Sequence, residues 1–119
     1  MKKVTCLVVL AATLLPAAAW ADCTYPKKPA KAPDGSHATR DEMLSAKKIN
    51  DQYQTDVSAY LKCLGEEKEG AMGKAANDDE KKKITARWEK KNDAAVDEAQ
   101  DVADRFNEQL HAFKAKSAK

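Results

Sequence analysis

The chain has 119 residues, and its 21 Lys and Arg side chains against 19 Asp and Glu give a formal net charge of +2. Two of the lysines lie within residues 1–21, so the rest of the chain is formally neutral, with both signs of charge interspersed. Such a surface has no long-range field to attract nucleic acid or an anionic membrane, and we expect neither partner.

Residues 1–21 have the pattern of a secretory signal peptide. The segment opens with two lysines, residues 4–19 are almost wholly apolar, and small residues stand at the two positions that signal peptidase reads, Ala19 and Ala21. The apolar run is shorter than the roughly 20 residues needed to span a bilayer. We therefore expect cleavage before Asp22, an exported protein and no membrane span after cleavage.

Residues 22–38 contain three prolines and several lysines, which favours an extended polyproline arm. Cys23 in this arm and Cys63 are the only cysteines after residue 21, and the exported compartment is oxidising. An extended arm can reach back along a following helix to Cys63, and closing that loop would stabilise the fold by about 4 kcal/mol. An intermolecular bridge that makes a covalent dimer, and two reactive thiols, are the alternatives.

A first helix is predicted over about residues 39–68. Thr39 and Glu42 have the spacing of a capping box at its start. Apolar residues and one asparagine then recur with a heptad period: Met43, Ala46, Asn50, Tyr53, Val57, Tyr60 and Leu64. Gly65 and the glycines of residues 70–73 are predicted to end the helix.

A second helix is predicted over about residues 77–116. Asn77 or Asp78 can cap its start, and the acidic residues 78–80 complement the helix dipole there. The seam of this helix has a period close to that of a straight helix, and its members are Ile84, Trp88, Asn92, Ala95, Ala99, Val102, Phe106, Leu110 and Phe113. We expect an all-α fold: a two-helix antiparallel hairpin with an extended Pro-rich N-terminal arm tied by a disulfide.

A connection centred near Ala71 would place Asn50 level with Asn92. A buried hydrogen bond between these side chains would fix the register at some cost in stability. The alternative is that each asparagine lies at a solvent-exposed edge of the seam. The same register sets Tyr53 beside Trp88 and Val57 beside Ile84.

In this register, the last turns of the second helix also extend beyond Thr39, where the first helix begins. Its apolar side chains would then lack an intramolecular cover. With Trp88, the residues Phe106, Leu110 and Phe113 form the predicted interaction surface, for a protein partner or a homo-oligomer.

The sequence contains no phosphate-binding loop, no nucleophile elbow and no His-Glu-x-x-His helix. We expect no catalytic residue, no cofactor and no metal, although the register brings His37 near His111, where a soft copper or zinc site is conceivable. Asp93, Asp97, Asp101, Asp104 and Glu108 form an acidic stripe that we interpret as a solvated face. The leading hypothesis is a non-enzymatic structural or protein-interaction module of the cell envelope. The alternative is a small-ligand or metal-binding envelope stress protein.

The clearest sequence features lie between residues 23 and 64. They are Cys23 with Pro26 and Pro29, the Pro33-Asp34-Gly35 turn, Thr39 to Met43, and Tyr60-Leu61-Lys62-Cys63-Leu64. Together they resemble a family of small exported proteobacterial proteins of uncharacterised function. The resemblance implies a bacterial, periplasmic or secreted protein with a bond between Cys23 and Cys63. It implies no activity, cofactor or catalytic residue.

Overall fold

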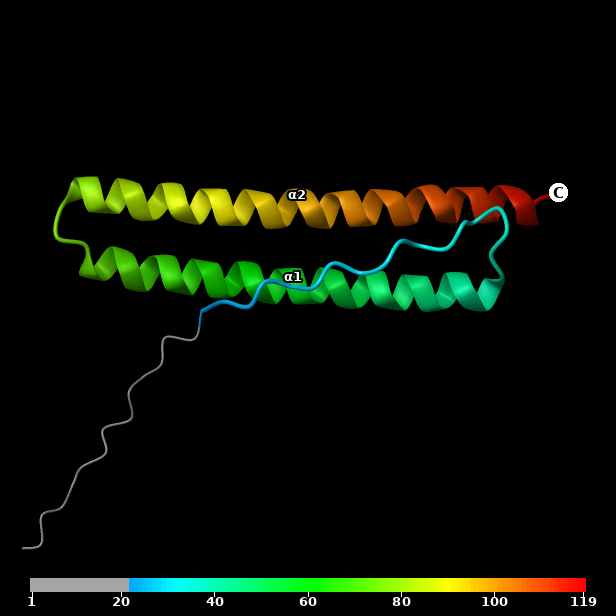
Figure 1. The fold of residues 1–119 in the computed structure, drawn as a ribbon, viewed down its shortest axis with the longest axis horizontal. Helices are drawn as coiled ribbons and strands as arrows, with labels where there is room; N and C mark the ends of the chain where they lie inside the picture. Colours follow the sequence, from blue (N-terminus) through cyan, green and yellow to red (C-terminus); the bar gives the residue numbers. More distant parts are fainter. Residues whose placement is uncertain (1–21) are drawn as a thin grey trace, which may run out of the picture.

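The computed structural model describes residues 22–119, and the predicted signal peptide lies outside the described residues. Two long helices, α1 (Arg40–Lys74) and α2 (Asp78–Ser117), lie side by side and antiparallel (Figure 1). The extended segment before α1 runs along them as an arm. The all-α hairpin with an N-terminal arm is confirmed. Within residues 22–119, no helix is apolar over a stretch long enough to cross a membrane.

Both helices begin where their caps were predicted. At the start of α1 the backbone N–H of Glu42 donates to Thr39 Oγ1 (3.3 Å), and the N–H of Thr39 donates to Glu42 Oε2 (2.7 Å), which completes the capping box. At the start of α2 the N–H of Glu80 donates to Asn77 Oδ1 (2.9 Å). These bonds satisfy backbone donors that have no partner inside the helix.

The predicted end of the first helix is wrong, because α1 continues through Gly65, Gly70 and Gly73 to Lys74. A glycine inside a helix costs about 1 kcal/mol relative to alanine, a loss that packing against a second helix offsets. The helix ends where the backbone of Ala75 turns to an extended conformation (φ −63°, ψ 131°). Only residues 75–77 connect the two helices.

The predicted register is wrong for the same reason. The connection is centred on Ala76, so each residue of α1 lies opposite a residue of α2 about ten positions later than expected. Asn50 and Asn92 do not pair: Asn50 lines a pocket with Val102 and Phe106, whereas Asn92 Nδ2 donates to Asp93 Oδ1 (3.4 Å). Tyr53 and Val57 pack with Ala99 and Val102, and not beside Trp88 and Ile84.

The core consists of three small apolar clusters in a row along the helix interface. The middle cluster is built on Tyr53, Val57, Ala99 and Val102, the cluster nearer the connection on Tyr60, Leu64 and Ala95, and the cluster nearer the arm's turn on Ala38, Met43 and Phe106. Leu110 and Phe113 pack against the last cluster, and Phe106 is only 7% exposed. The expectation that these three residues lack an intramolecular cover is therefore wrong, since the shifted register places the start of α1 beside them.

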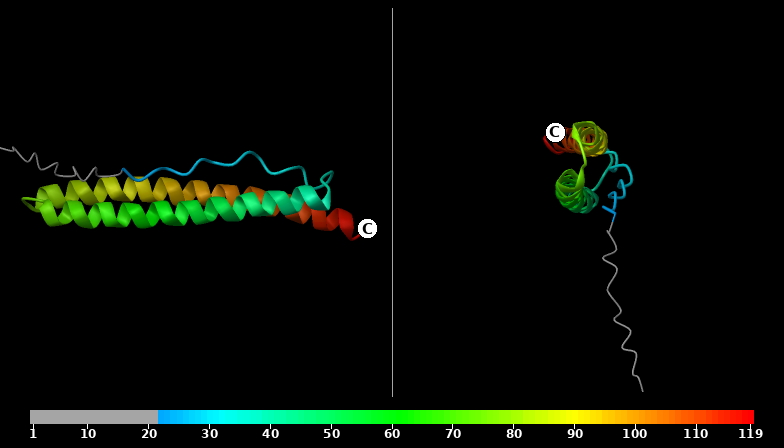
Figure 2. Two further views of the ribbon diagram at one scale, coloured as in Figure 1. Left: turned by 90° about the horizontal axis from the view of Figure 1, so that it is seen from below. Right: turned by 90° about the vertical axis from the view of Figure 1, so that its left-hand side faces the viewer.

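The arm follows the groove between the helices and is fixed near both of its ends (Figures 1 and 2). Cys23 is bonded to Cys63 of α1, with 5.7 Å between their Cα atoms, which confirms the intramolecular bridge. The Tyr25 ring meets the Tyr60 ring edge-on at 5.1 Å between centroids. The arm is a third layer that covers the groove from Cys63 to the N-terminus of α1.

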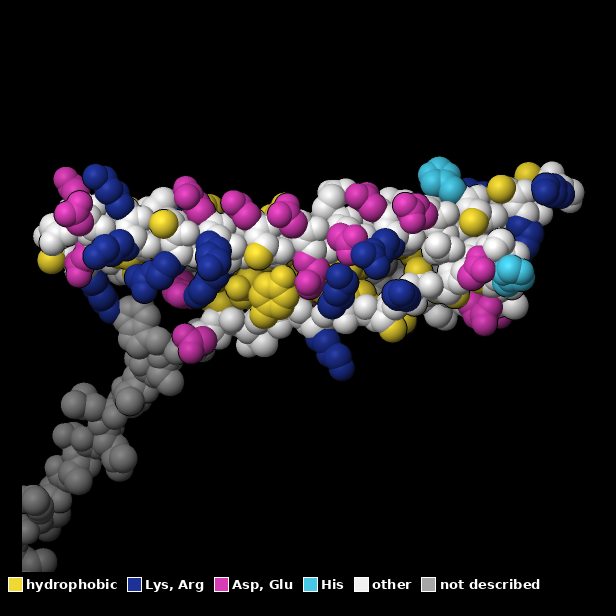
Figure 3. Space-filling model, turned by 45° about the horizontal axis from the view of Figure 1, so that its top comes forward, with side chains coloured by type: hydrophobic (Ala, Val, Ile, Leu, Met, Phe, Trp, Pro, Cys, Tyr) yellow, Lys and Arg dark blue, Asp and Glu magenta, His cyan; other side chains and the backbone are white. Residues whose placement is uncertain are grey.

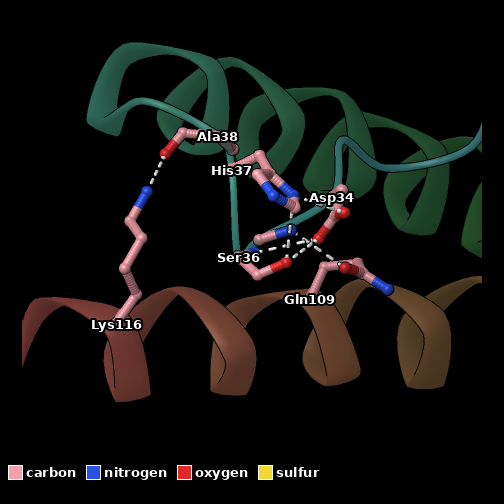
Figure 4. Close-up of polar contacts among 7 residues, drawn as sticks. Asp34, Ser36, His37, Ala38, Gln109 and Lys116 are labelled. Carbon is pink, nitrogen blue, oxygen red and sulfur yellow. Dashed lines mark hydrogen bonds and ion pairs between the residues drawn. The ribbon is translucent and has the colours of Figure 1, made fainter.

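The far end of the arm is fastened to α2 (Figure 4). The N–H of Gly35 donates to Gln109 Oε1 (2.9 Å), and Lys116 Nζ donates to the carbonyl oxygen of Ala38 (2.6 Å). The backbone of Gly35 comes so near α2 that a Cβ at this position would collide with the carbonyl oxygen of Gln109. Only glycine allows this close approach.

Candidate functional site

A pocket of about 710 Å³ lies between the arm and the two helices. Figure 2 shows the arm arching away from the helices in its middle and returning to them at its two ends. The pocket is lined by residues 28–33 of this arch and by side chains of both helices. Its volume lies within the roughly 300–1,000 Å³ of small-molecule sites.

The lining of the pocket is largely apolar and comes from three separate segments. Its apolar members are Pro29, Ala30, Ala32 and Pro33 of the arm, Ala46 and Ile49 of α1, and Val102 and Phe106 of α2. Ile49 is 56% exposed, an unusually open position for an aliphatic side chain of this size. The pocket therefore offers apolar contact area on several sides.

Asn50 is a half-buried polar residue of the pocket lining. Its Oδ1 atom is enclosed and accepts no hydrogen bond from residues 22–119. An enclosed acceptor without a donor costs about 1–3 kcal/mol, so such atoms are uncommon in folded proteins. Gln109, which also lines the pocket, uses its Oε1 to hold Gly35. The pocket thus combines apolar walls with an enclosed acceptor that no donor of residues 22–119 satisfies.

The rim of the pocket carries both signs of charge. Lys28 and Arg105 line the pocket, and both bond to Asp101, which lies outside the lining. Asp101 accepts a hydrogen bond from Arg105 Nε (2.9 Å) and one from Lys28 Nζ (3.2 Å), and these bonds, Arg105 first, hold the pKa of Asp101 below its usual range. The other charged lining residues are Lys31, Asp41, Glu42 and Glu108. Since positive and negative groups balance here, the rim does not favour a charged ligand of either sign.

The turn at the end of the arch is held by the carboxylate of Asp34 (Figure 4). It accepts hydrogen bonds from the hydroxyl and the N–H of Ser36 and bonds to His37 Nδ1 (2.9 Å). The Ser36 side chain first, and His37 second, lower the pKa of Asp34 to about 2. His37 is thereby part of a turn, and Figure 3 shows the two histidine side chains separated on the surface. Among residues 22–119, no three His, Cys, Asp or Glu side chains are grouped to hold a metal ion.

Among residues 22–119, each pKa that differs from its ordinary value is shifted away from neutral pH. Burial first, and the hydrogen bond from its hydroxyl to Glu98 (2.9 Å) second, raise the pKa of Tyr53. The backbone N–H of Thr39 is the main cause of the lowered pKa of Glu42. Both shifts follow from local burial and hydrogen bonding.

Three of the four residues of the predicted interaction surface lie together near the arm's turn, and Trp88 lies apart from them. Phe106 lines the pocket, Leu110 and Phe113 pack near the arm's turn, and Trp88 packs against the cluster near the hairpin connection. The sequence reasoning did not identify Asn50 as a binding residue. Its one signal was a polar residue in an apolar seam, for which we considered a pairing with Asn92 that fixes the register and a solvent-exposed edge of the seam.

In comparisons with known proteins, no family model, no curated protein and no solved structure matches this chain. Its function is therefore inferred from the chemistry of its own residues.

Proposed function

We propose that the protein is a non-enzymatic binding protein that holds a small uncharged molecule beneath its arm. The ligand has an apolar body and one N–H or O–H group that donates to Asn50 Oδ1. The enclosed, unpartnered oxygen of Asn50 is the observation that carries this proposal. The volume and apolar lining of the pocket support it, as does the balanced charge of the rim.

We also propose that the protein is exported, to the periplasm or outside the cell. The bond between Cys23 and Cys63 supports this location, because disulfides persist in oxidising compartments and are rare in the cytosol. The resemblance to exported proteobacterial proteins and the signal-peptide pattern of residues 1–21 agree with it. Ligand binding in such a compartment corresponds to the alternative hypothesis from the sequence, a small-ligand-binding envelope protein.

The test uses N-phenyl-1-naphthylamine, an uncharged aromatic amine with one N–H donor whose fluorescence rises in apolar surroundings. We expect the disulfide-bonded protein to bind it saturably with one site. Asn50→Leu keeps the size of the side chain and removes the acceptor. Because a neutral hydrogen bond contributes about 0.5–1.5 kcal/mol, this change should weaken binding about two- to tenfold. It should also raise the melting temperature, since the enclosed polar atom is removed.

Asn92→Leu is the matched control, because Asn92 is also a half-buried helical asparagine but does not line the pocket. Its affinity for the probe should equal that of the unchanged protein. Ala46→Trp, which fills the pocket from α1, should abolish binding. A probe that does not bind saturably, or that binds Ala46→Trp as tightly as the unchanged protein, would contradict the proposed site.

A protein partner or a second copy of the chain is the second candidate. The observation that favours it is the Leu44 side chain on α1, which is 53% exposed and lies outside the pocket lining. Light scattering should then show a dimer mass at high protein concentration and a monomer for Leu44→Ser. A monomer for both proteins would remove the second copy as a partner.

A further inference from the structure

Between the disulfide and the hairpin connection, the described part of the arm does not cover the groove between α1 and α2. There a second cavity, of about 120 Å³, lies between residues 64–71 of α1 and residues 84–91 of α2. It shares no lining residue with the pocket beneath the arm. In Figure 3, Lys and Arg side chains lie interspersed with Asp and Glu side chains at the hairpin-connection end of the visible face.

Trp88 lines this cavity, and its Nε1 atom is buried with no acceptor among the described residues. The indole N–H is a donor only, so the group that satisfies it must be an acceptor. Lys68 Nζ lies 4.0 Å from the centroid of the same ring, which places a positive charge beside the indole.

The charged side chains of the cavity are mainly positive. Lys68, Arg87 and Lys91 line it together with one carboxylate, Glu67, which pairs with Lys91 at 3.4 Å. Arg87 is exposed and forms no ion pair within residues 22–119. A free guanidinium presents donors in a planar fork that matches the oxygens of carboxylates and phosphates.

We propose that this cavity binds a small oxyanion group, a carboxylate or a phosphate. The Arg87 guanidinium donates to its oxygens, the enclosed Trp88 Nε1 donates to them once the indole turns toward the cavity, and Lys68 and Lys91 supply the remaining positive charge. The volume is about four times the share of one water molecule in the liquid, which gives room for an acetate- or phosphate-sized group. A neutral water molecule would satisfy the indole but would leave the charge of Arg87 unpaired.

The experiment reads Trp88 directly by fluorescence. The chain contains two tryptophans, so Trp20→Phe in the full chain makes Trp88 the sole fluorescent indole. Sodium acetate and sodium phosphate are titrated separately, with sodium chloride holding the ionic strength constant. We expect a saturable change of Trp88 fluorescence with at least one oxyanion, and the tighter of the two identifies the chemical class.

Arg87→Gln should weaken this binding at least tenfold, as expected for the loss of a charge-assisted hydrogen bond. Lys90→Gln is the matched control, because it removes the same charge from the same helix outside the cavity, and it should leave the affinity unchanged. If neither oxyanion gives a saturable response, or if the two variants lose equal affinity, the proposed site is overturned. Arg87→Gln should bind N-phenyl-1-naphthylamine as tightly as the unchanged protein does. A failure of the oxyanion site can therefore be distinguished from a failure of the pocket beneath the arm.

Discussion

Replacing both bonded cysteines, as Cys23→Ala with Cys63→Ala, should lower the free energy of unfolding by about 4 kcal/mol. The two cysteines are 40 positions apart, and the chain-entropy model gives this value for closing a loop of that length in the unfolded state. For a domain of 60–100 residues, each kcal/mol corresponds to about 4–8 °C in melting temperature, so we expect a decrease of about 15–30 °C. This loss is large relative to the total stability, because the apolar clusters between the helices are small.

Urea unfolding followed by far-ultraviolet circular dichroism measures this difference. The unfolded variant lacks the cross-link and exposes more surface, so its unfolding free energy should also depend more steeply on urea. The unchanged protein in reducing buffer is the control and should match the double variant. A loss below about 1 kcal/mol with an unchanged urea dependence would refute the loop-closure reasoning. If the reduced protein is stable and the double variant is not, the loss of stability comes from the packing of the replaced side chains and not from loop closure.

Two further predictions concern the arm's turn and the glycines of α1. Gly35→Ala should destabilise the protein and free the arm's turn, because the added Cβ collides with α2. Gly65→Ala should stabilise the protein by about 0.5–1 kcal/mol, since nothing lies within 4 Å of the new Cβ. Thermal unfolding of both variants checks this contrast, and equal effects would contradict it. The lowered pKa of Asp34 means that its contribution to stability is present above its ordinary pKa of 3.8 and is lost as the pH falls toward about 2. Thermal unfolding should show a steeper loss of stability over this pH range for the unchanged protein than for Asp34→Asn, and parallel profiles would count against the role of this turn.

The local features of the fold could be predicted from the sequence because short-range chemistry determines them. Thr39 and Glu42 form a capping box whatever the rest of the chain does, and the prolines of residues 22–38 keep that segment extended. The pairing of Cys23 with Cys63 followed from the reach of this arm and the small number of cysteines. Each of these inferences depends on residues that are near in sequence or on a simple length limit.

The register, and with it the pocket, depends on the residue at which α1 ends, and the composition of the chain does not reveal that residue. Gly65 and Gly73 weaken a helix but do not end it when an apolar seam continues on both sides of them, and residues 75–77 then become the connection. An error of five residues in the centre of the connection becomes about ten residues at the facing helix. Asn50 was therefore paired with the wrong residue, and its enclosed oxygen beneath the arm could be found only from the structure.

The two fastenings of the arm have a consequence for proteolysis. Lys27 and Lys31, neither of which is followed by proline, are exposed on the arm between the bond at Cys23 and the turn at Gly35. A trypsin-like enzyme that cuts there breaks the backbone but does not release the N-terminal fragment, because the sulfur atoms still join it to α1. Nicked and intact molecules then migrate together on a non-reducing gel and separate only after a thiol is added.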